Sequence, residues 1–131
     1  MSILKPIQTA QAPQAIGCYS QAVQAGSWLF LSGQIGLDPV TQQLVSAECE
    51  AQLQQVFKNL EAVLTQAGAN WSHVVKLNVY LTDLQHFSLV NDLMHQTFKE
   101  PYPARAAVQV AALPKGALVE VDGMAVLPAG F

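Results

Sequence analysis

Arg105 is the only arginine in the chain, and it begins an apolar segment directly after Pro101-Tyr102-Pro103. A guanidinium is a rigid planar fork that binds a carboxylate through two parallel hydrogen bonds. Side chains of a strand alternate between faces, which predicts one face with Arg105, Ala107 and Gln109 and another with Ala106, Val108 and Val110. We expect the second face to join the core. The first face leaves the guanidinium beside small side chains, where a ligand has room.

Glu120 is the second candidate for chemistry, in the next apolar segment, Leu118-Val119-Glu120-Val121-Asp122. If the two segments are neighbouring strands, Glu120 lies near Arg105, and two interpretations are open. One is an internal salt bridge between Arg105 and Glu120. The other is a pocket in which Arg105 holds a small carboxylate while Glu120 handles a water molecule or a proton.

Other polar residues give weaker signals. Ser32 begins Ser32-Gly33-Gln34-Ile35-Gly36, which lacks the lysine and the glycine spacing of a phosphate-binding loop. As a nucleophile, Ser32 would need a base, and the sequence places no histidine near it. Tyr19 suits a packed aromatic residue as well as a ligand contact, and Asn91 suits an exposed helix position. No spacing of cysteine and histidine indicates a metal site.

Hydrophobic periodicity predicts the elements of the first half. Two short strands flank a turn at residues 25–27, and the second strand, from Trp28 to Ser32, is apolar on both faces and should be buried. A helix follows, with Ser46 as candidate N-cap and Gly68 at its end. Its apolar stripe consists of Leu53, Val56, Phe57, Leu60, Val63, Leu64 and Ala67. Its opposite face carries Gln55, Lys58, Asn59 and Glu61.

The second half continues with a strand, a helix and two strands. Residues 74–81 alternate as a strand with one buried face, and residues 87–98 form a shorter helix that ends before Pro101. Two strands, at about 104–112 and 118–127, complete the chain. This order predicts an α/β or α+β architecture in which two helices cover one face of a mixed sheet, as a single domain over residues 1–131.

The composition is poor in charge. Charged residues make up 11% of the 131 residues, against about 25% in an average soluble domain, while hydrophobic residues reach 51%. The net charge of −3 disfavours binding to nucleic acid phosphates or anionic lipid. So little charge predicts that part of the surface is hidden in an oligomer, although a glutamine-rich surface would explain the same numbers.

The N-terminus and the cysteines favour a cytoplasmic protein. The first six residues lack the order of a signal peptide, and no apolar run approaches the ~20 residues that span a bilayer. Cys18 and Cys49 do not form a disulfide framework.

Short blocks of sequence occur in an order that is specific to one family. They are Ala15-Ile16-Gly17-Cys18-Tyr19-Ser20-Gln21-Ala22, Leu31-Ser32-Gly33-Gln34-Ile35, Val90-Asn91, Pro103-Ala104-Arg105-Ala106-Ala107-Val108, Leu113-Pro114-Lys115 and Val119-Glu120-Val121. The ordered set spans essentially the whole chain, which resembles the RidA/YjgF/YER057c/UK114 family of reactive-intermediate deaminases.

The resemblance implies a chorismate-mutase-like fold in a homotrimer with pockets at the subunit interfaces, which would account for the missing charge. It implies hydrolysis of enamines and imines (2-aminoacrylate/2-iminopropanoate and 2-iminobutanoate) to 2-oxo acids and ammonia, with no metal or organic cofactor. Arg105 then binds the substrate carboxylate, and Glu120 orients and activates the attacking water. The residues that line the pocket are Tyr19, Ser32, Asn91 and Ala107.

Two positions depart from the family pattern. Ala107 stands where many relatives have cysteine, so its role is preserved only if that residue acts through its backbone. Cys18 replaces the proline that usually precedes the tyrosine, which loosens a backbone constraint. Two other functions stay open: a non-catalytic trimer that binds 2-oxo acids and regulates a partner, and RNA cleavage, which the acidic balance and the single arginine argue against.

Overall fold

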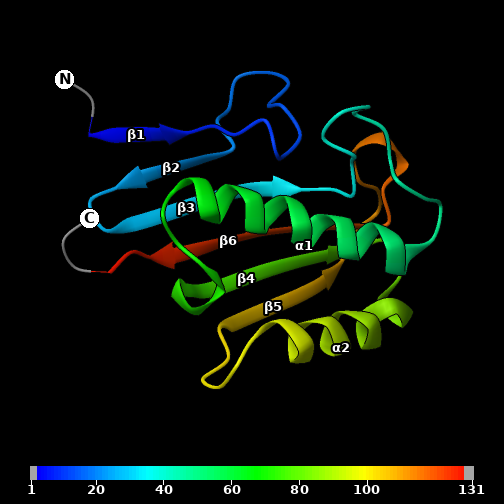
Figure 1. Cartoon of the computed structure of the whole chain (residues 1–131). Helices are drawn as coiled ribbons and strands as arrows, with labels where there is room; N and C mark the ends of the chain where they lie inside the picture. The colour runs from blue at the N-terminus through cyan, green and yellow to red at the C-terminus, as the bar shows by residue number, and fades with distance from the viewer. Residues whose placement is uncertain (1–2, 129–131) are drawn as a thin grey trace.

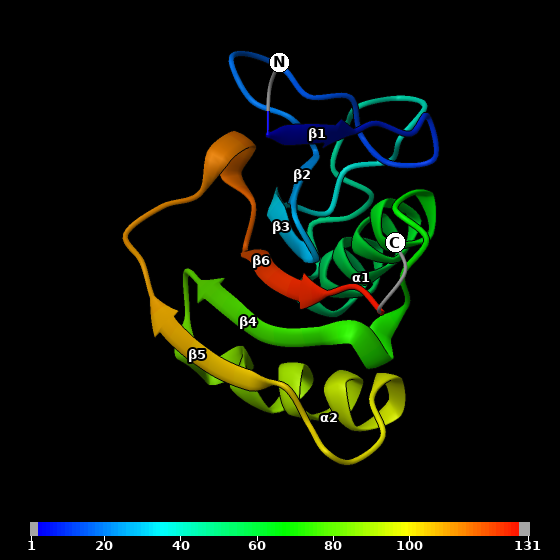
Figure 2. The same ribbon diagram turned by 90° about the vertical axis from the view of Figure 1, so that its left-hand side faces the viewer.

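The computed structural model describes residues 3–128, which form one six-stranded sheet in the order β1-β2-β3-β6-β4-β5. Only β4 and β5 run parallel among the paired strands. The strands are β1 (Leu4–Ile7), β2 (Ala22–Ala25), β3 (Trp28–Gln34), β4 (Val74–Leu81), β5 (Ala104–Gln109) and β6 (Val119–Val126). The helices α1 (Cys49–Gln66) and α2 (Phe87–Thr97) cover the same face, which confirms the predicted α+β architecture (Figures 1 and 2).

Helix α1 packs on the sheet through the predicted apolar stripe, all of which is buried. The predicted N-cap is wrong by two residues, because the N-cap is Glu48 and Ser46 Oγ instead accepts a hydrogen bond from the Glu48 N–H. Gly68 follows the C-cap Ala67 with a φ of 79°, as expected for a helix end. Asn59 was expected on the solvent face but is fully buried, since its amide bonds backbone groups of the β3–α1 connection.

The face of the sheet opposite the helices is uncovered among residues 3–128, and we call it the open face (Figure 2). The expectation that β3 is buried on both sides is therefore wrong. Leu29 and Leu31 face the helices and are buried, whereas Trp28 and Phe30 are 46% and 41% exposed and stack on each other. The alternation of β4 also shifts near its start, where an irregular register between Val74 and Lys76 leaves Val75 exposed.

Two expectations for β5 are also wrong. Arg105 pairs with the buried Leu77 of β4, so the face with Arg105, Ala107 and Gln109 points toward α2. Ala106 and Val108 lie on the open face and are exposed. Strand β4 lies between β5 and β6, so the strands that carry Arg105 and Glu120 are not neighbours.

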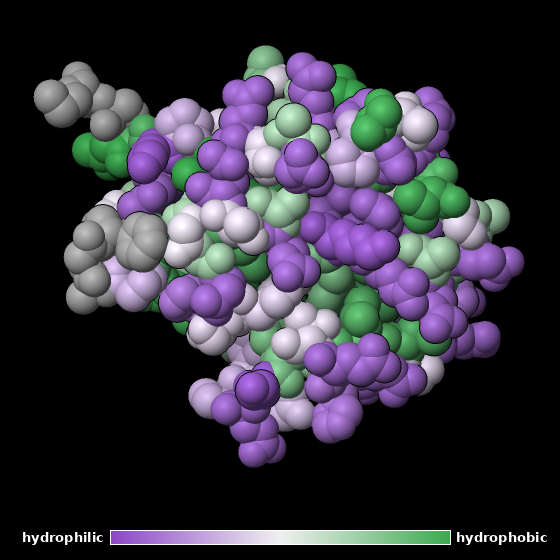
Figure 3. Space-filling model, in the orientation of Figure 1, coloured by the Kyte–Doolittle hydropathy of each residue, from purple (hydrophilic) through white to green (hydrophobic). Residues whose placement is uncertain are grey.

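The helix-covered side is mostly hydrophilic, with apolar residues scattered singly over it (Figure 3). Neither helix within residues 3–128 has the length and apolar character that a membrane crossing requires.

Candidate functional site

The guanidinium of Arg105 lies at the exposed outer edge of the sheet, beside α2. Its Nη1 donates a hydrogen bond to Asn91 Oδ1 and lies 3.6 Å from Met94 Sδ. Its central carbon lies 4.6 Å from the ring centroid of Phe87, close enough for a cation–π contact. Three residues of one helix thus orient the guanidinium while most of its donors remain available for an anion.

The backbone of Ala107 faces the same edge. In a parallel ladder, the N–H groups of alternate residues point to the same neighbour. Val110 N donates to Leu81 O in β4, so the N–H groups of Ala106 and Val108 also point to β4 and those of Arg105 and Ala107 point outward. We call Asn91, Arg105 and Ala107 the Arg105 edge. A guanidinium and an N–H are both suitable donors to a carboxylate.

A hollow of about 550 Å³ adjoins the Arg105 edge. Its lining residues are Asn91, Asp92, Met94, His95, Tyr102, Pro103 and Arg105. Two of these residues contact each other, because His95 Nδ1 and Tyr102 Oη lie 3.1 Å apart. The expectation of space beside Arg105 is confirmed, although α2 and the segment before β5 supply that space.

Glu120 occupies a different place, at the start of β6. The pairing of β3 and β6 is irregular between Leu31 and Gln34, and the Glu120 carboxylate fills the space over Gly33, where a Cβ would collide with its Oε2. Burial raises the pKa of Glu120, and the negative charge of Asp122 raises it further. A raised pKa makes the Glu120 carboxylate a stronger base, which suits a group that accepts a proton.

Ser32 and Tyr19 lie on the segments next to Glu120. Ser32 precedes Gly33, and its Oγ donates to Ser20 O at 2.6 Å, which ties β3 to the residue that follows Tyr19. The Tyr19 hydroxyl accepts a hydrogen bond from the Ile16 N–H, and 53% of the side chain is exposed. We call Tyr19, Ser32, Gly33 and Glu120 the Glu120 corner.

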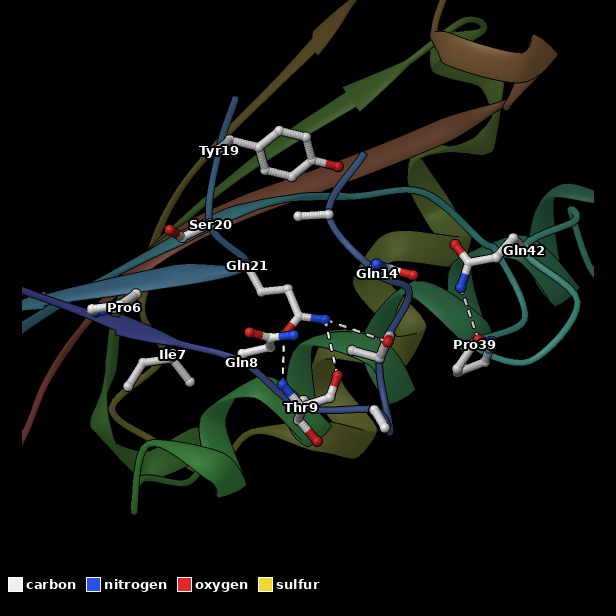
Figure 4. A pocket seen from close by; sticks show the side chains of 13 residues that line it. Pro6, Ile7, Gln8, Thr9, Gln14, Tyr19, Ser20, Gln21, Pro39 and Gln42 are labelled. Carbon is white, nitrogen blue, oxygen red and sulfur yellow. Dashed lines mark hydrogen bonds between the residues drawn. The ribbon is translucent and has the colours of Figure 1, made fainter. Parts of the chain in front are cut away.

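Buried amides hold the loops around this corner. The Gln21 side chain accepts from Thr9 N at 2.7 Å and donates to the carbonyls of Thr9, Ala12 and Pro13, which fixes the loop that ends at Tyr19 (Figure 4). Asn59 donates to the carbonyls of Ile35 and Leu37 after β3. Gln52 Oε1 accepts from Leu118 N, immediately before β6.

The same loop lines a second hollow of about 550 Å³ (Figure 4). Its polar lining includes Gln8, Gln14, Gln42 and Tyr19, and it contains no charged side chain. It therefore offers no cation to hold a carboxylate. Of the predicted site residues, only Tyr19 reaches it.

Arg105 and Glu120 are on opposite faces of the sheet. Glu120 pairs with Tyr80 on the open face, whereas Arg105 pairs with Leu77 on the helix-covered face. Their Cα atoms are separated by three residues along β4 and by two strand spacings, or roughly 14 Å. No ion pair joins them in the described chain, and the interpretation as an internal salt bridge is wrong. One copy therefore does not bring the two groups together.

Sequence reasoning missed two residues beside Glu120. Asp122 lies two positions further along β6 and accepts hydrogen bonds from Asn78 at 2.7 Å and from Tyr80 at 2.9 Å. The bond to Asp122, then burial and the nearby negative charges, raise the pKa of Tyr80. The available signal was the alternation of polar Lys76, Asn78 and Tyr80 with apolar residues along β4. No group of three potential metal ligands occurs within residues 3–128.

The comparisons with known proteins agree with the blocks of sequence. The family model described as Endoribonuclease L-PSP matches residues 9–127. Protein DfrA of Myxococcus xanthus is 52% identical over 124 residues, or 93% of this chain and 95% of DfrA. The human protein named 2-iminobutanoate/2-iminopropanoate deaminase is 47% identical over 124 residues, or 95% of this chain and 90% of the human protein. The chain belongs to the RidA/YjgF/YER057c/UK114 family.

A solved structure supports the same assignment. RidA from the Antarctic bacterium Psychrobacter sp. PAMC 21119 matches this RidA-family chain with a TM-score of 0.90 at 49% identity. The match covers 94% of this chain and 99% of that chain. Membership of the RidA family establishes the fold and the kinship of this chain.

Proposed function

We propose that this chain hydrolyses small 2-imino acids, among them 2-iminopropanoate and 2-iminobutanoate, to 2-oxo acids and ammonia. The observation that carries the proposal is the Arg105 edge, where a guanidinium and the Ala107 N–H face outward together. This arrangement suits a small carboxylate. The deaminase name of the human relative supports the choice of substrate.

Arg105 would hold the substrate carboxylate and so fix the neighbouring imine carbon. An enamine such as 2-aminoacrylate first takes a proton at its terminal carbon and becomes the iminium. Glu120 then accepts a proton from water as the water oxygen bonds to the imine carbon. Glu120 passes this proton to the nitrogen, the C–N bond breaks and ammonia leaves, and Glu120 takes the hydroxyl proton as the carbonyl forms. An imine is already electrophilic, so positioning and proton transfer suffice.

We further propose that the complete site lies between copies of the chain in a homotrimer. Arg105 and Glu120 lie on opposite faces of one sheet, so a second copy must bring its Glu120 corner to the Arg105 edge. The open face has the apolar surface that such an assembly would bury: Val23, Trp28, Phe30, Val108, Met124 and Val126. A closed trimer would repeat the same contact three times.

Mixed trimers test this arrangement. Arg105→Ala and Glu120→Gln chains are each expected to form inactive trimers. Each mixed trimer would contain one complete site in three if Arg105 and Glu120 of a site come from different chains. Random mixing makes three quarters of the trimers mixed, so co-expression is expected to restore about a quarter of the wild-type activity. The assay supplies 2-aminoacrylate from serine through a dehydratase and follows the loss of the imine.

The outcomes separate the parts of the proposal. Activity that stays at the level of the single variants would show that each site lies within one chain. Saturable binding of 2-oxobutanoate without hydrolysis of any imine would favour the non-catalytic binding module. A reducing cytoplasm, where pyridoxal-phosphate enzymes release such imines, is the compartment that suits this function, and fractionation of cells with an antibody checks it.

A further inference from the structure

Asp122 is held at a fixed position beside Glu120. The two residues are two positions apart on β6, so both side chains are on the open face. Asn78 Nδ2 donates to Asp122 Oδ1 at 2.7 Å, and Tyr80 Oη donates to Asp122 Oδ2 at 2.9 Å. Both donors come from β4, where Asn78 pairs with Asp122 and Tyr80 pairs with Glu120. The strand pairing and both hydrogen bonds therefore restrain the same carboxylate.

Within one copy of the chain, the other groups that face Glu120 bring little charge. Strand β3 contributes Ser32 and Gly33, and β4 contributes Tyr80 at the paired position. Lys76 pairs with Met124, four residues further along β6. The next strand, β5, places Val108 beside Tyr80. Within residues 3–128, Asp122 is the charged side chain that acts on Glu120.

We propose that Asp122 is a positioning residue that keeps Glu120 basic enough to accept a proton from the attacking water, and that Tyr80 limits this effect. This inference rests on the function proposed above. Two ionised carboxylates on one face repel each other. The negative charge of Asp122 therefore makes Glu120 bind a proton more readily. The Tyr80 hydroxyl and the Asn78 amide partly compensate that charge. The two donors therefore limit the effect of Asp122 on Glu120.

The pH dependence of kcat/KM tests the proposal with two variants that should shift the pH profile in opposite directions. Asp122→Asn removes the charge beside Glu120. The acidic limb of the profile, where kcat/KM falls as Glu120 takes up a proton, is therefore expected to move to lower pH. The rate on that limb, relative to the plateau, should rise about threefold, the size expected for two nearby surface carboxylates. Tyr80→Phe leaves the charge less compensated, so the limb is expected to move to higher pH. Glu61→Gln, on the exposed face of α1, removes the same charge at a distance and should leave the limb in place.

A second readout does not depend on catalysis. With ¹³C-labelled glutamate, the carboxyl signal of Glu120 is assigned by its loss in Glu120→Gln, and its titration midpoint is followed by NMR. The midpoint should fall in Asp122→Asn and rise in Tyr80→Phe. If Asp122→Asn does not fold, Tyr80→Phe decides the question. The inference would be overturned if, in the folded variants, both the acidic limb of kcat/KM and the titration midpoint of Glu120 stay at their wild-type positions.

The two proposals fail in different ways. If wild-type protein hydrolyses imines but neither variant moves the limb or the midpoint, the role of Asp122 is wrong and the proposed function stands. If wild-type protein hydrolyses no imine, the proposed function is wrong. The NMR midpoint then still shows whether Asp122 controls the protonation of Glu120.

Discussion

The Arg105 edge is exposed and is oriented by side chains of α2, whereas the Glu120 corner is half-buried and is framed by loops that buried amides fix. The exposed edge offers a guanidinium and a backbone N–H as hydrogen-bond donors, which suits the capture of an anion. The corner has partial burial and a neighbouring carboxylate, which suits proton transfer. In the proposed function, binding therefore falls mainly to the edge and chemistry mainly to the corner.

Glu120→Gln is expected to have the largest effect and tests the role of the corner in chemistry. Loss of a general base should lower kcat by about 10²–10⁴-fold with little change in KM. Steady-state kinetics with 2-iminobutanoate checks this. A proportional rise in KM would instead assign Glu120 to binding.

The same substitution is expected to stabilise the protein at neutral pH. Burial raises the pKa of Glu120, so the folded state binds the proton more tightly than the unfolded state does. Ionisation therefore costs stability above the folded pKa, and the cost disappears as the pH falls below the unfolded value. Melting temperatures of Glu120→Gln should exceed those of wild type at pH 7 and converge with them in acid. A lower melting temperature at pH 7 would contradict this account.

Arg105→Lys is expected to have the next largest effect and tests the edge. Lysine keeps the charge but loses the planar fork and its contact with Phe87, so kcat/KM should fall by about 30-fold. Lys99→Arg, an exposed change nearby in the sequence, provides the control. Wild-type kinetics in Arg105→Lys would show that a point charge is enough to bind the substrate carboxylate and that the planar guanidinium is not needed.

Gly33→Ala tests whether the Arg105 edge and the Glu120 corner have separate roles, because the substitution acts on the Glu120 corner alone. The new Cβ would collide with the Glu120 carboxylate, whose flexible end must move. We expect about a tenfold loss in kcat, since small displacements of a catalytic group are costly, and no change in the affinity for 2-oxobutanoate. Weaker 2-oxobutanoate binding in calorimetry would mean that the two regions are not separable.

Ala107→Cys is expected to have the smallest effect. The Ala107 N–H points outward from β5, and this donor is independent of the side chain, so kcat/KM should stay within about twofold of wild type. A rise of tenfold or more would instead show that a thiol at this position contributes to catalysis.

Most of the elements were predictable because each carries its own local signal, but the short edge strand β1 was not predicted. The stripe of α1 and the alternation of β4 predicted both elements to within a few residues. The cap at Ser46, the exposure of Asn59 and the start of the alternation in β4 were wrong. Arg105 and Glu120 could be selected from the residue types and from the family blocks, because a single arginine is conspicuous in a chain with only 11% charged residues.

The sheet order could not be predicted, because it depends on long-range pairing. β6 inserts between β3 and β4, a choice that no local pattern of β5 or β6 specifies. The faces of β5 were assigned in reverse for a related reason. Ala106 and Val108 are apolar and suggested a core face, but the helices cover the other side and leave them on the open face.

The side chains that hold the Glu120 corner have a consequence for any experiment that varies the solution. Gln21, Gln52 and Asn59 are neutral amides, so neither protons nor salt alter their hydrogen bonds in the range where Glu120 titrates. The scaffold around the carboxylate therefore stays constant while the carboxylate itself changes charge. A change of rate with pH will thus report the ionisation of the site and not a structural change in the loops around it.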